Sequence, residues 1–249
     1  MRLLVSVASA AEASAALAGG ADVIDAKNPL AGALGAVSTD TLRDIHATIA
    51  GVRLVTAAIG DAAGEAATER TAGAFAAAGA ALVKVGFAGI SSASRVEVLI
   101  RAAVRGAGAG PPGANGGVVA VAYADADRAG SVPASVLVDV AARAGASGVL
   151  LDTADKAGPG LRLLISPTVL AGWVSGAREA GLLVALAGKL TADDLAFVRD
   201  AGADIAGVRG AACEGGRSGR VSIERVALLR TLCGPARAGQ YVDDLSFER

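Results

Sequence analysis

The sequence is poor in the residues that build metal centres, disulfide frameworks and nucleic-acid surfaces. Its 249 residues include two cysteines and one histidine, too few for a disulfide framework or a His/Cys zinc site. Aromatic residues make up 3% of the chain and the formal net charge is −1, whereas a nucleic-acid surface needs a basic face and often stacking rings. We therefore expect a cytoplasmic protein with no metal, no cofactor and no nucleic-acid partner.

Long apolar stretches are also missing. Glycine, lysine or arginine interrupts each one before the ~18–20 residues that a membrane span requires, so no membrane partner is expected. The first residues, MRLLVSVASA, share some features with a secretion signal, but a strand followed by an Ala-rich helix explains them better. With 53% hydrophobic residues, the chain can bury a large core.

A short apolar run followed by an Ala-rich helical segment recurs along the chain. The runs are continuously apolar rather than alternating, which is typical of parallel strands covered on both faces. Helical segments such as 64–79, 91–106 and 191–202 end at glycine, and Ser or Thr begins several of them. The predicted strands cover residues 3–7, 22–26, 53–59, 81–86, 118–123, 148–152, 182–188 and 204–210.

Eight such units in about 250 residues predict one α/β domain, a (β/α)₈ TIM barrel over 1–249 with a C-terminal tail from about 234. The alternative is a doubly wound sheet, which would place a G-x-G-x-x-G turn after the first strand. The sequence there, ASAAEA, has no glycine. The Gly-rich stretch 107–117 is predicted to be a flexible loop on the N-terminal face.

Lysine is scarce and unevenly placed: the chain has 19 arginines but only four lysines. A lysine amine with a lowered pKa can act as a nucleophile or carry protons, which a guanidinium cannot do. The alternative for any one of them is a salt bridge at the rim. The four lie in or just after the last part of a predicted strand, at the barrel end where active sites form: Lys27, Lys84, Lys156 and Lys189.

Strand periodicity groups charged side chains at this end. Asp25 and Lys27 are two residues apart and point the same way, and Lys84 lies among apolar residues in a strand whose outer face packs on helices. Asp152 ends the sixth strand and Lys156 follows it. We predict these five as the catalytic set. Buried amines beside a second cation suit Schiff-base chemistry with a carbonyl, although the residues alone do not decide which amine is the nucleophile.

The loops after the seventh and eighth predicted strands have the composition of a phosphate site. Their glycines let backbone N–H groups approach an anion, and Arg209 could add a charge-assisted fork. An ordinary helix cap is the alternative for either loop taken alone. The predicted phosphate-binding residues are Gly188, Lys189, Gly207, Arg209 and Gly210.

Two other candidates are weaker. Asp125 and Asp127 follow the fifth predicted strand, and we expect them to orient the lysines or substrate hydroxyls rather than to bind a metal. The single histidine, His46, lies in the middle of a predicted helix and is expected to serve packing.

Several motifs, in this order and spacing, resemble the (5-formylfuran-3-yl)methyl phosphate synthase family. The resemblance runs from the first strand to about residue 233. It implies a lyase that joins two molecules of glyceraldehyde 3-phosphate, releases phosphate and water, and serves the biosynthesis of methanofuran-type C1 carriers. It also implies that Lys27 forms the Schiff base and Lys84 moves protons. The motifs are LLVSV, GGADVIDAKNPLAGALGA, KVG, AYADADRAG, LLDTADK, ALAGKL and DIAGVRGAACEGG.

Two other functions fit the same residues. A Schiff-base aldolase acting on another small sugar phosphate would use the same amines and phosphate loops. A non-enzymatic barrel that binds a phosphorylated metabolite would need the loops but not Lys27. We also expect a homo-oligomer, and the roles of Lys189 and of the tail stay open.

Overall fold

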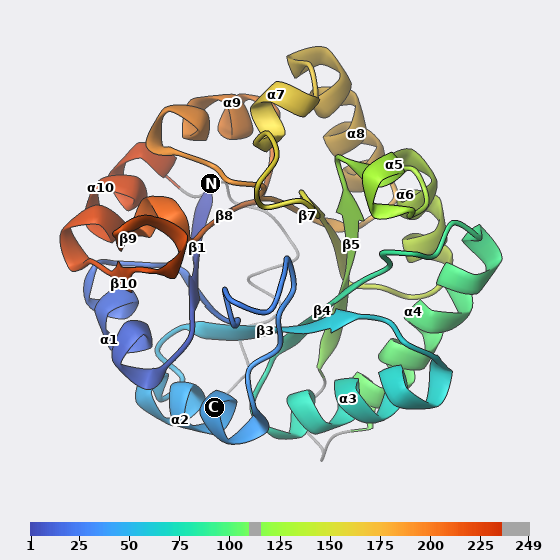
Figure 1. Ribbon diagram of the computed structural model, residues 1–249, viewed down its shortest axis with the longest axis horizontal. Coiled ribbons are helices and arrows are strands. Elements are labelled where there is room, and N and C mark those ends of the chain that lie inside the picture. Colours follow the sequence, from blue (N-terminus) through green and yellow to red (C-terminus); the bar gives the residue numbers. More distant parts are fainter. Residues whose placement is uncertain (110–115, 236–249) are drawn as a thin grey trace.

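The computed structural model describes residues 1–109 and 116–235, and a closed barrel of eight parallel strands forms its centre. The strands follow one another around the barrel in chain order, and β8 pairs with β1 to close it. Figure 1 shows the helices arranged around this barrel. The predicted TIM barrel is confirmed. Its strands are β1 (Arg2–Val7), β2 (Val23–Ala26), β3 (Leu54–Asp61), β4 (Leu82–Gly86), β5 (Gly117–Tyr123), β6 (Gly148–Asp152), β7 (Leu183–Leu186) and β8 (Ile205–Val208).

Serine begins most of the long helices. Ser9, Ser38, Ser92, Ser166 and Ser222 each accept the backbone N–H of the third following residue, which satisfies one of the unpaired donors of the first turn. The helices are α1 (Ala10–Ala18), α2 (Thr39–Ile49), α3 (Glu65–Ala77), α4 (Ala93–Gly108), α5 (Ala126–Ala129), α6 (Ala134–Arg143), α7 (Leu161–Leu164), α8 (Pro167–Glu179), α9 (Leu195–Asp200) and α10 (Ile223–Cys233).

Two details differ from the sequence prediction. The helix expected over 191–202 begins as a 3₁₀ turn, η1 (Ala192–Asp194), because the Thr191 backbone N–H and hydroxyl both donate to Asp194 Oδ2. The loop after β8 contains a small antiparallel hairpin, β9 (Cys213–Glu214) and β10 (Arg220–Val221), which the sequence did not reveal.

The barrel interior is apolar at one end and polar at the other. Leu4, Val23, Leu82 and Leu150 are buried inside the barrel, in the first or middle part of their strands. Side chains two residues further along point the same way, so the next interior positions fall near the carboxyl ends of the strands. These next positions are polar: Ser6, Asp25, Lys84 and Asp152.

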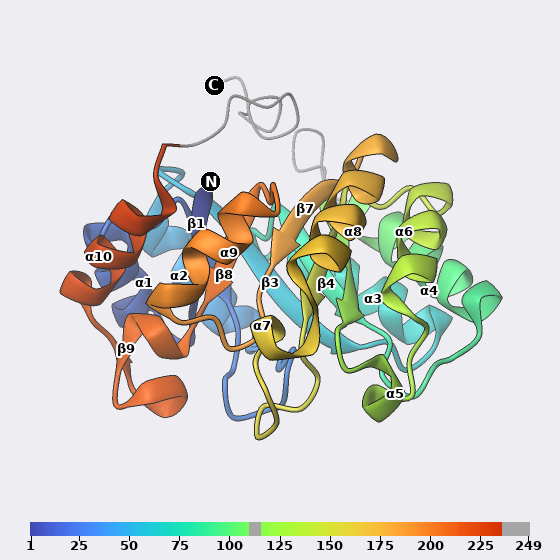
Figure 2. The same ribbon diagram turned by 90° about the horizontal axis from the view of Figure 1, so that it is seen from above.

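The first and last described residues, Met1 and Pro235, meet at the apolar end of the barrel. The Met1 amine donates to the Pro235 carbonyl at 2.7 Å. Figure 2 shows the N-terminus on one side of the barrel, and the loops after β2 and β6 on the opposite side. Most of the predicted loop 107–117, and the predicted tail from residue 236 on, lie outside the described residues. Among the helices that the structure describes, none is both long and apolar enough to cross a membrane.

Candidate active site

Asp25 lies at the centre of a hydrogen-bonded row across three strands. Ser6, Asp25 and Thr56 pair in register on β1, β2 and β3. The hydroxyl of Ser6 donates to Asp25 Oδ2 at 2.9 Å, and that of Thr56 donates to Oδ1 at 2.8 Å. The Lys84 amine, from β4, forms an ion pair with Oδ1. The fully buried carboxylate is thus compensated by three donors and holds Lys84 in a fixed place.

Sequence reasoning missed Ser6 and Thr56. Each is a polar residue inside an apolar run, LLVSV and RLVTAAI. Strand periodicity also puts each on the interior face, two residues after Leu4 and Leu54. This signal was present in the sequence and could have identified both hydroxyls.

Lys27 follows β2 directly and is buried, with 8% of its surface exposed. Its Nζ lies 3.8 Å from Asp152 Oδ2, and no hydrogen bond of this amine is found among residues 1–109 and 116–235. Burial lowers the pKa of Lys27 to about 8. The negative charge of Asp152 opposes this effect, whereas the cations Lys84 and Lys156 add to it.

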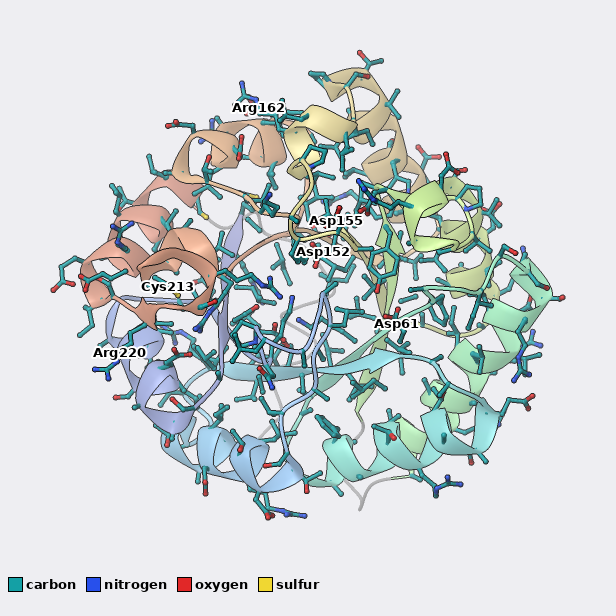
Figure 3. The ribbon with its side chains drawn as sticks, in the orientation of Figure 1. Asp61, Asp152, Asp155, Arg162, Cys213 and Arg220 are labelled. Atoms are coloured by element: carbon teal, nitrogen blue, oxygen red, sulfur yellow. The ribbon has the colours of Figure 1, made fainter. Side chains whose placement is uncertain are left out.

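Asp152 joins two of the lysines. Figure 3 shows it at the end of β6, directed toward the centre of the barrel. Its Oδ1 accepts from the Lys156 amine and from the Thr153 N–H, both at 2.7 Å, while Oδ2 faces Lys27. Burial alone would raise the pKa of Asp152, but Lys156 and Lys27 outweigh it, and the pKa is lowered. Asp152 is therefore charged at neutral pH.

Asp125 positions the loop that carries Lys156. Its two carboxylate oxygens accept the backbone N–H groups of Ala154 and Asp155 at 2.7 and 2.9 Å. Asp125 therefore acts on the backbone of this loop, and its expected role in orienting lysines or substrate hydroxyls stays a prediction. Asp127 is exposed in the first turn of α5. Across the described parts of the chain, no three His, Cys, Asp or Glu side chains are grouped to hold a metal ion.

All four lysines line one cavity of about 550 Å³, which extends from the barrel interior to the loops after β7 and β8. The structure thus places Lys27, Lys84, Lys156 and Lys189 together at one end of the barrel, as predicted. Their roles stay predictions. Asp152 lines the cavity as well, and Asp25 lies buried behind Lys84. The five predicted phosphate-binding residues also line it: Gly188, Lys189, Gly207, Arg209 and Gly210.

The loop after β7 turns back on the loop after β6. Gly188 has a positive φ of 103°, and its carbonyl accepts the Leu161 N–H at 2.9 Å. Lys189 is one of the two non-glycine residues with positive φ in the described chain, and its amine donates to the Gly158 carbonyl. The two loops therefore form one wall of the cavity. At least one N–H donor of the Lys189 amine is used in the bond that joins them.

The structure gives Arg209 a different environment from the one expected. Its guanidinium donates to both carboxylate oxygens of Glu12, to the Ser6 carbonyl at 3.0 Å, to that of Arg217 at 3.1 Å and to that of Gly219 at 2.8 Å. A guanidinium has five N–H donors, and these contacts engage all five. The contacts therefore do not support Arg209 as a phosphate ligand; they describe a buried residue that ties the loop after β8 to β1 and α1.

Gly86, the glycine of the KVG motif, is required by close packing. A methyl group at this position would lie 2.3 Å from Asp61 Oδ1 and 2.4 Å from the Tyr123 hydroxyl. That hydroxyl donates to Asp61 at 2.7 Å, and burial together with the Asp61 charge raises the pKa of Tyr123. His46 lies exposed on α2 and does not line the cavity.

The fold and the site define a (β/α)₈-barrel protein with a lysine-lined cavity at the carboxyl ends of its strands. Residues 3–230 match the family model described as 4-HFC-P synthase. The (5-formylfuran-3-yl)methyl phosphate synthase of Methanocaldococcus jannaschii is 39% identical over 236 residues, which cover 94% of this chain and 100% of that protein. That of Methanopyrus kandleri is 41% identical, covering 93% of this chain and 97% of that protein. The chain belongs to the (5-formylfuran-3-yl)methyl phosphate synthase family, and it is an enzyme.

Solved structures of other proteins share the fold. A 3-hexulose-6-phosphate synthase aligns with a TM-score of 0.61 at 24% identity, covering 93% of this chain and 99% of that one. The protein KGPDC of Streptococcus mutans aligns with a TM-score of 0.64 at 16% identity, covering 93% and 96%. At these identities the likeness concerns the barrel alone.

Proposed function

We propose that this enzyme is a lyase that joins two molecules of glyceraldehyde 3-phosphate into (5-formylfuran-3-yl)methyl phosphate through a Schiff base at Lys27. The atoms balance if one inorganic phosphate and two waters leave. The reaction would supply the furan of methanofuran-type C1 carriers in the cytoplasm. Family membership supports the product, and the state of the Lys27 amine supports the mechanism.

The mechanism depends on one observation: the Lys27 amine is buried, has no close ion-pair partner and has a lowered pKa. The Lys84 and Lys156 amines are paired with Asp25 and Asp152, whereas the carboxylate nearest to Lys27 is 3.8 Å away. With a pKa of about 8, roughly half of the Lys27 amines are neutral at pH 8, against on the order of 0.3% for an ordinary lysine. Only the neutral amine can attack an aldehyde.

The surrounding charges suit the steps that follow. The Lys27 amine adds to the first aldehyde, and loss of water gives a cationic iminium that the facing carboxylate of Asp152 stabilises. Lys84 first gives one proton to the paired carboxylate of Asp25, and as the neutral amine it then takes the proton from the adjacent carbon, which yields an enamine. The enamine carbon bonds to the aldehyde carbon of the second molecule, and elimination of phosphate and ring closure follow. Lys156 keeps Asp152 charged and oriented.

The loops after β7 and β8 are the proposed binding site for a substrate phosphate. Gly188, Lys189, Gly207 and Gly210 line the cavity on that side, where glycines allow the backbone to approach an anion. Arg209 acts indirectly in this scheme, because it fixes the second of these loops without offering a donor.

Incubation of the purified enzyme with glyceraldehyde 3-phosphate alone tests the proposal. A furan absorbs in the near ultraviolet, and the mass of the product identifies it. A linear aldol product lacks that absorbance and would favour an aldolase. Binding without any turnover would contradict the proposed reaction.

Borohydride added during turnover tests the nucleophile, since it should fix the substrate as a mass increase on the peptide that contains Lys27. Lys27→Arg is the control, because it retains the cation and cannot form the imine. An adduct on another lysine would contradict the assignment.

A further inference from the structure

The cavity contains a cation that the proposed mechanism does not use. Arg217 lies in the 3₁₀ turn η3 (Gly216–Ser218) between β9 and β10, is half-buried, and lines the same cavity as Lys27. Its Nε donates to the Pro29 carbonyl at 3.1 Å, and Nη2 donates to the Gly32 carbonyl at 2.7 Å. Both carbonyls belong to the loop that begins right after Lys27, so Arg217 fastens that loop to the β9–β10 hairpin.

The charge of Arg217 has no carboxylate partner in residues 1–109 and 116–235. Lys84, Lys156 and Arg209 are each paired with an acid, whereas the two recorded acceptors of the Arg217 side chain are neutral carbonyls. These bonds use two of the five N–H donors of the guanidinium. Burial lowers the pKa of Arg217, although the charge of Asp152 counteracts this. A partly desolvated guanidinium with spare donors is suited to bind an anion.

The proposed reaction requires two phosphorylated molecules in one cavity. The loop after β7 and the first residues after β8 are proposed for one phosphate, on the wall that includes Gly188 and Lys189, whereas Arg217 lies further along the loop after β8. Arg217 is joined to the loop after β2, which follows Lys27 in the chain. The second phosphate therefore needs a cation, and Arg217 is one without an acidic partner among the described residues.

We propose that Arg217 binds a second phosphate monoester in this cavity and, through its bonds to Pro29 and Gly32, couples that binding to the position of the loop after Lys27. That a second phosphate enters the cavity, and that it belongs to a second glyceraldehyde 3-phosphate, rests on the proposed function. The recognition itself is that of a phosphate monoester by a bidentate guanidinium.

The backbone around Arg217 is already fixed for this role. Arg209 Nε donates to the Arg217 carbonyl, and Arg209 Nη2 donates to the Gly219 carbonyl two residues later. Arg209 is itself held by both carboxylate oxygens of Glu12 on α1. Arg209 and Glu12 thus anchor the turn that carries Arg217 to the barrel. Because the turn is already ordered, binding an anion costs less conformational entropy.

Titration calorimetry with glycerol 3-phosphate tests the proposal, because this monoester has no aldehyde and cannot form an imine. Wild-type protein should bind two equivalents. In Arg217→Met one site should weaken by about 10- to 150-fold, the effect of losing a charge-assisted hydrogen bond. Arg217→Lys should recover part of the loss. Arg220→Met is the matched control, since Arg220 is exposed on the same hairpin and does not line the cavity (Figure 3).

Three results would overturn the proposal: a single site in wild-type protein, unchanged affinity in Arg217→Met, or equal losses in the Met and Lys variants. In the last case, faster amide exchange of residues 28–35 in both variants would identify Arg217 as a fastening for the loop alone. If the Met variant does not fold, Arg217→Gln removes the charge and retains an N–H donor. Failure of the proposed function would appear separately, as missing furan or missing imine, since glycerol 3-phosphate binding requires neither.

Discussion

The pKa of Lys27 should fall when the charge of Asp152 is removed. In Asp152→Asn, the anion 3.8 Å from the Lys27 amine becomes a neutral amide of similar shape. At that distance a charge pair is worth about 1 kcal/mol in water and about 4 kcal/mol at an effective dielectric constant of 20. At 1.36 kcal/mol per pH unit, the titration midpoint should move down from about 8 by roughly one to three pH units.

Competitive acetylation measures this midpoint without substrate. Only neutral amines react, and the four lysines can be followed as separate peptides by mass spectrometry between about pH 5 and 11. Lys27 in wild-type protein should react with a midpoint near 8. Asp155→Asn is the control, since Asp155 lies in the same loop and is not among the charges that shift the pKa of Lys27.

An unchanged or raised Lys27 midpoint in Asp152→Asn would refute the reasoning. It would mean that Asp152 does not stabilise the charged amine, and the same carboxylate could then not be invoked to stabilise an iminium. Equal shifts in Asp152→Asn and Asp155→Asn would point instead to a general rearrangement of the loop after β6.

Three further predictions concern the lysine cluster and the ion pair that holds the loop after β8. Lys84→Ala should lose turnover yet still be trapped by borohydride at Lys27, because imine formation needs the nucleophile and not the proton shuttle; absence of any adduct would show that Lys84 is required earlier. Lys27→Met should stabilise the fold at pH 7 by up to about 3 kcal/mol, since a lysine with a folded-state pKa of about 8 and an unfolded value of 10.5 destabilises the folded state below pH 8. That gain should vanish as the pH rises toward 10.5, and urea unfolding of both proteins at pH 7 and pH 10 checks its size and sign. Glu12→Ala should cost about 3–5 kcal/mol in the free energy of unfolding, because it leaves the buried guanidinium of Arg209 without its carboxylate. Urea unfolding would measure this cost as well, and a loss below 1 kcal/mol would contradict the structural role given to Arg209.

Local sequence determined the barrel and the end of it that carries chemistry. Continuous apolar runs specify strands covered on both faces, and a period of two residues decides which side chains enter the barrel. For this reason the sequence alone groups Asp25, Lys84 and Asp152, with Lys27, at the carboxyl ends of the strands. The same period could have identified Ser6, because only its position within the run LLVSV was needed.

The tertiary structure decided which partner each charge meets. Arg209 and Glu12 are 197 residues apart in the chain, and only closure of the barrel between β8 and β1 brings the carboxylate to the guanidinium. Arg217 donates to the Pro29 carbonyl, although the two residues are 188 positions apart in the sequence. The β9–β10 hairpin that carries Arg217 was not predicted from the sequence. The sequence prediction therefore assigned the phosphate to Arg209, in a glycine-rich loop that also contains Arg217. Hydrogen bonds engage all five N–H donors of Arg209 but only two of those of Arg217. Most of the partners in these bonds are far apart in the sequence, so only the tertiary structure decides which arginine keeps donors for a ligand.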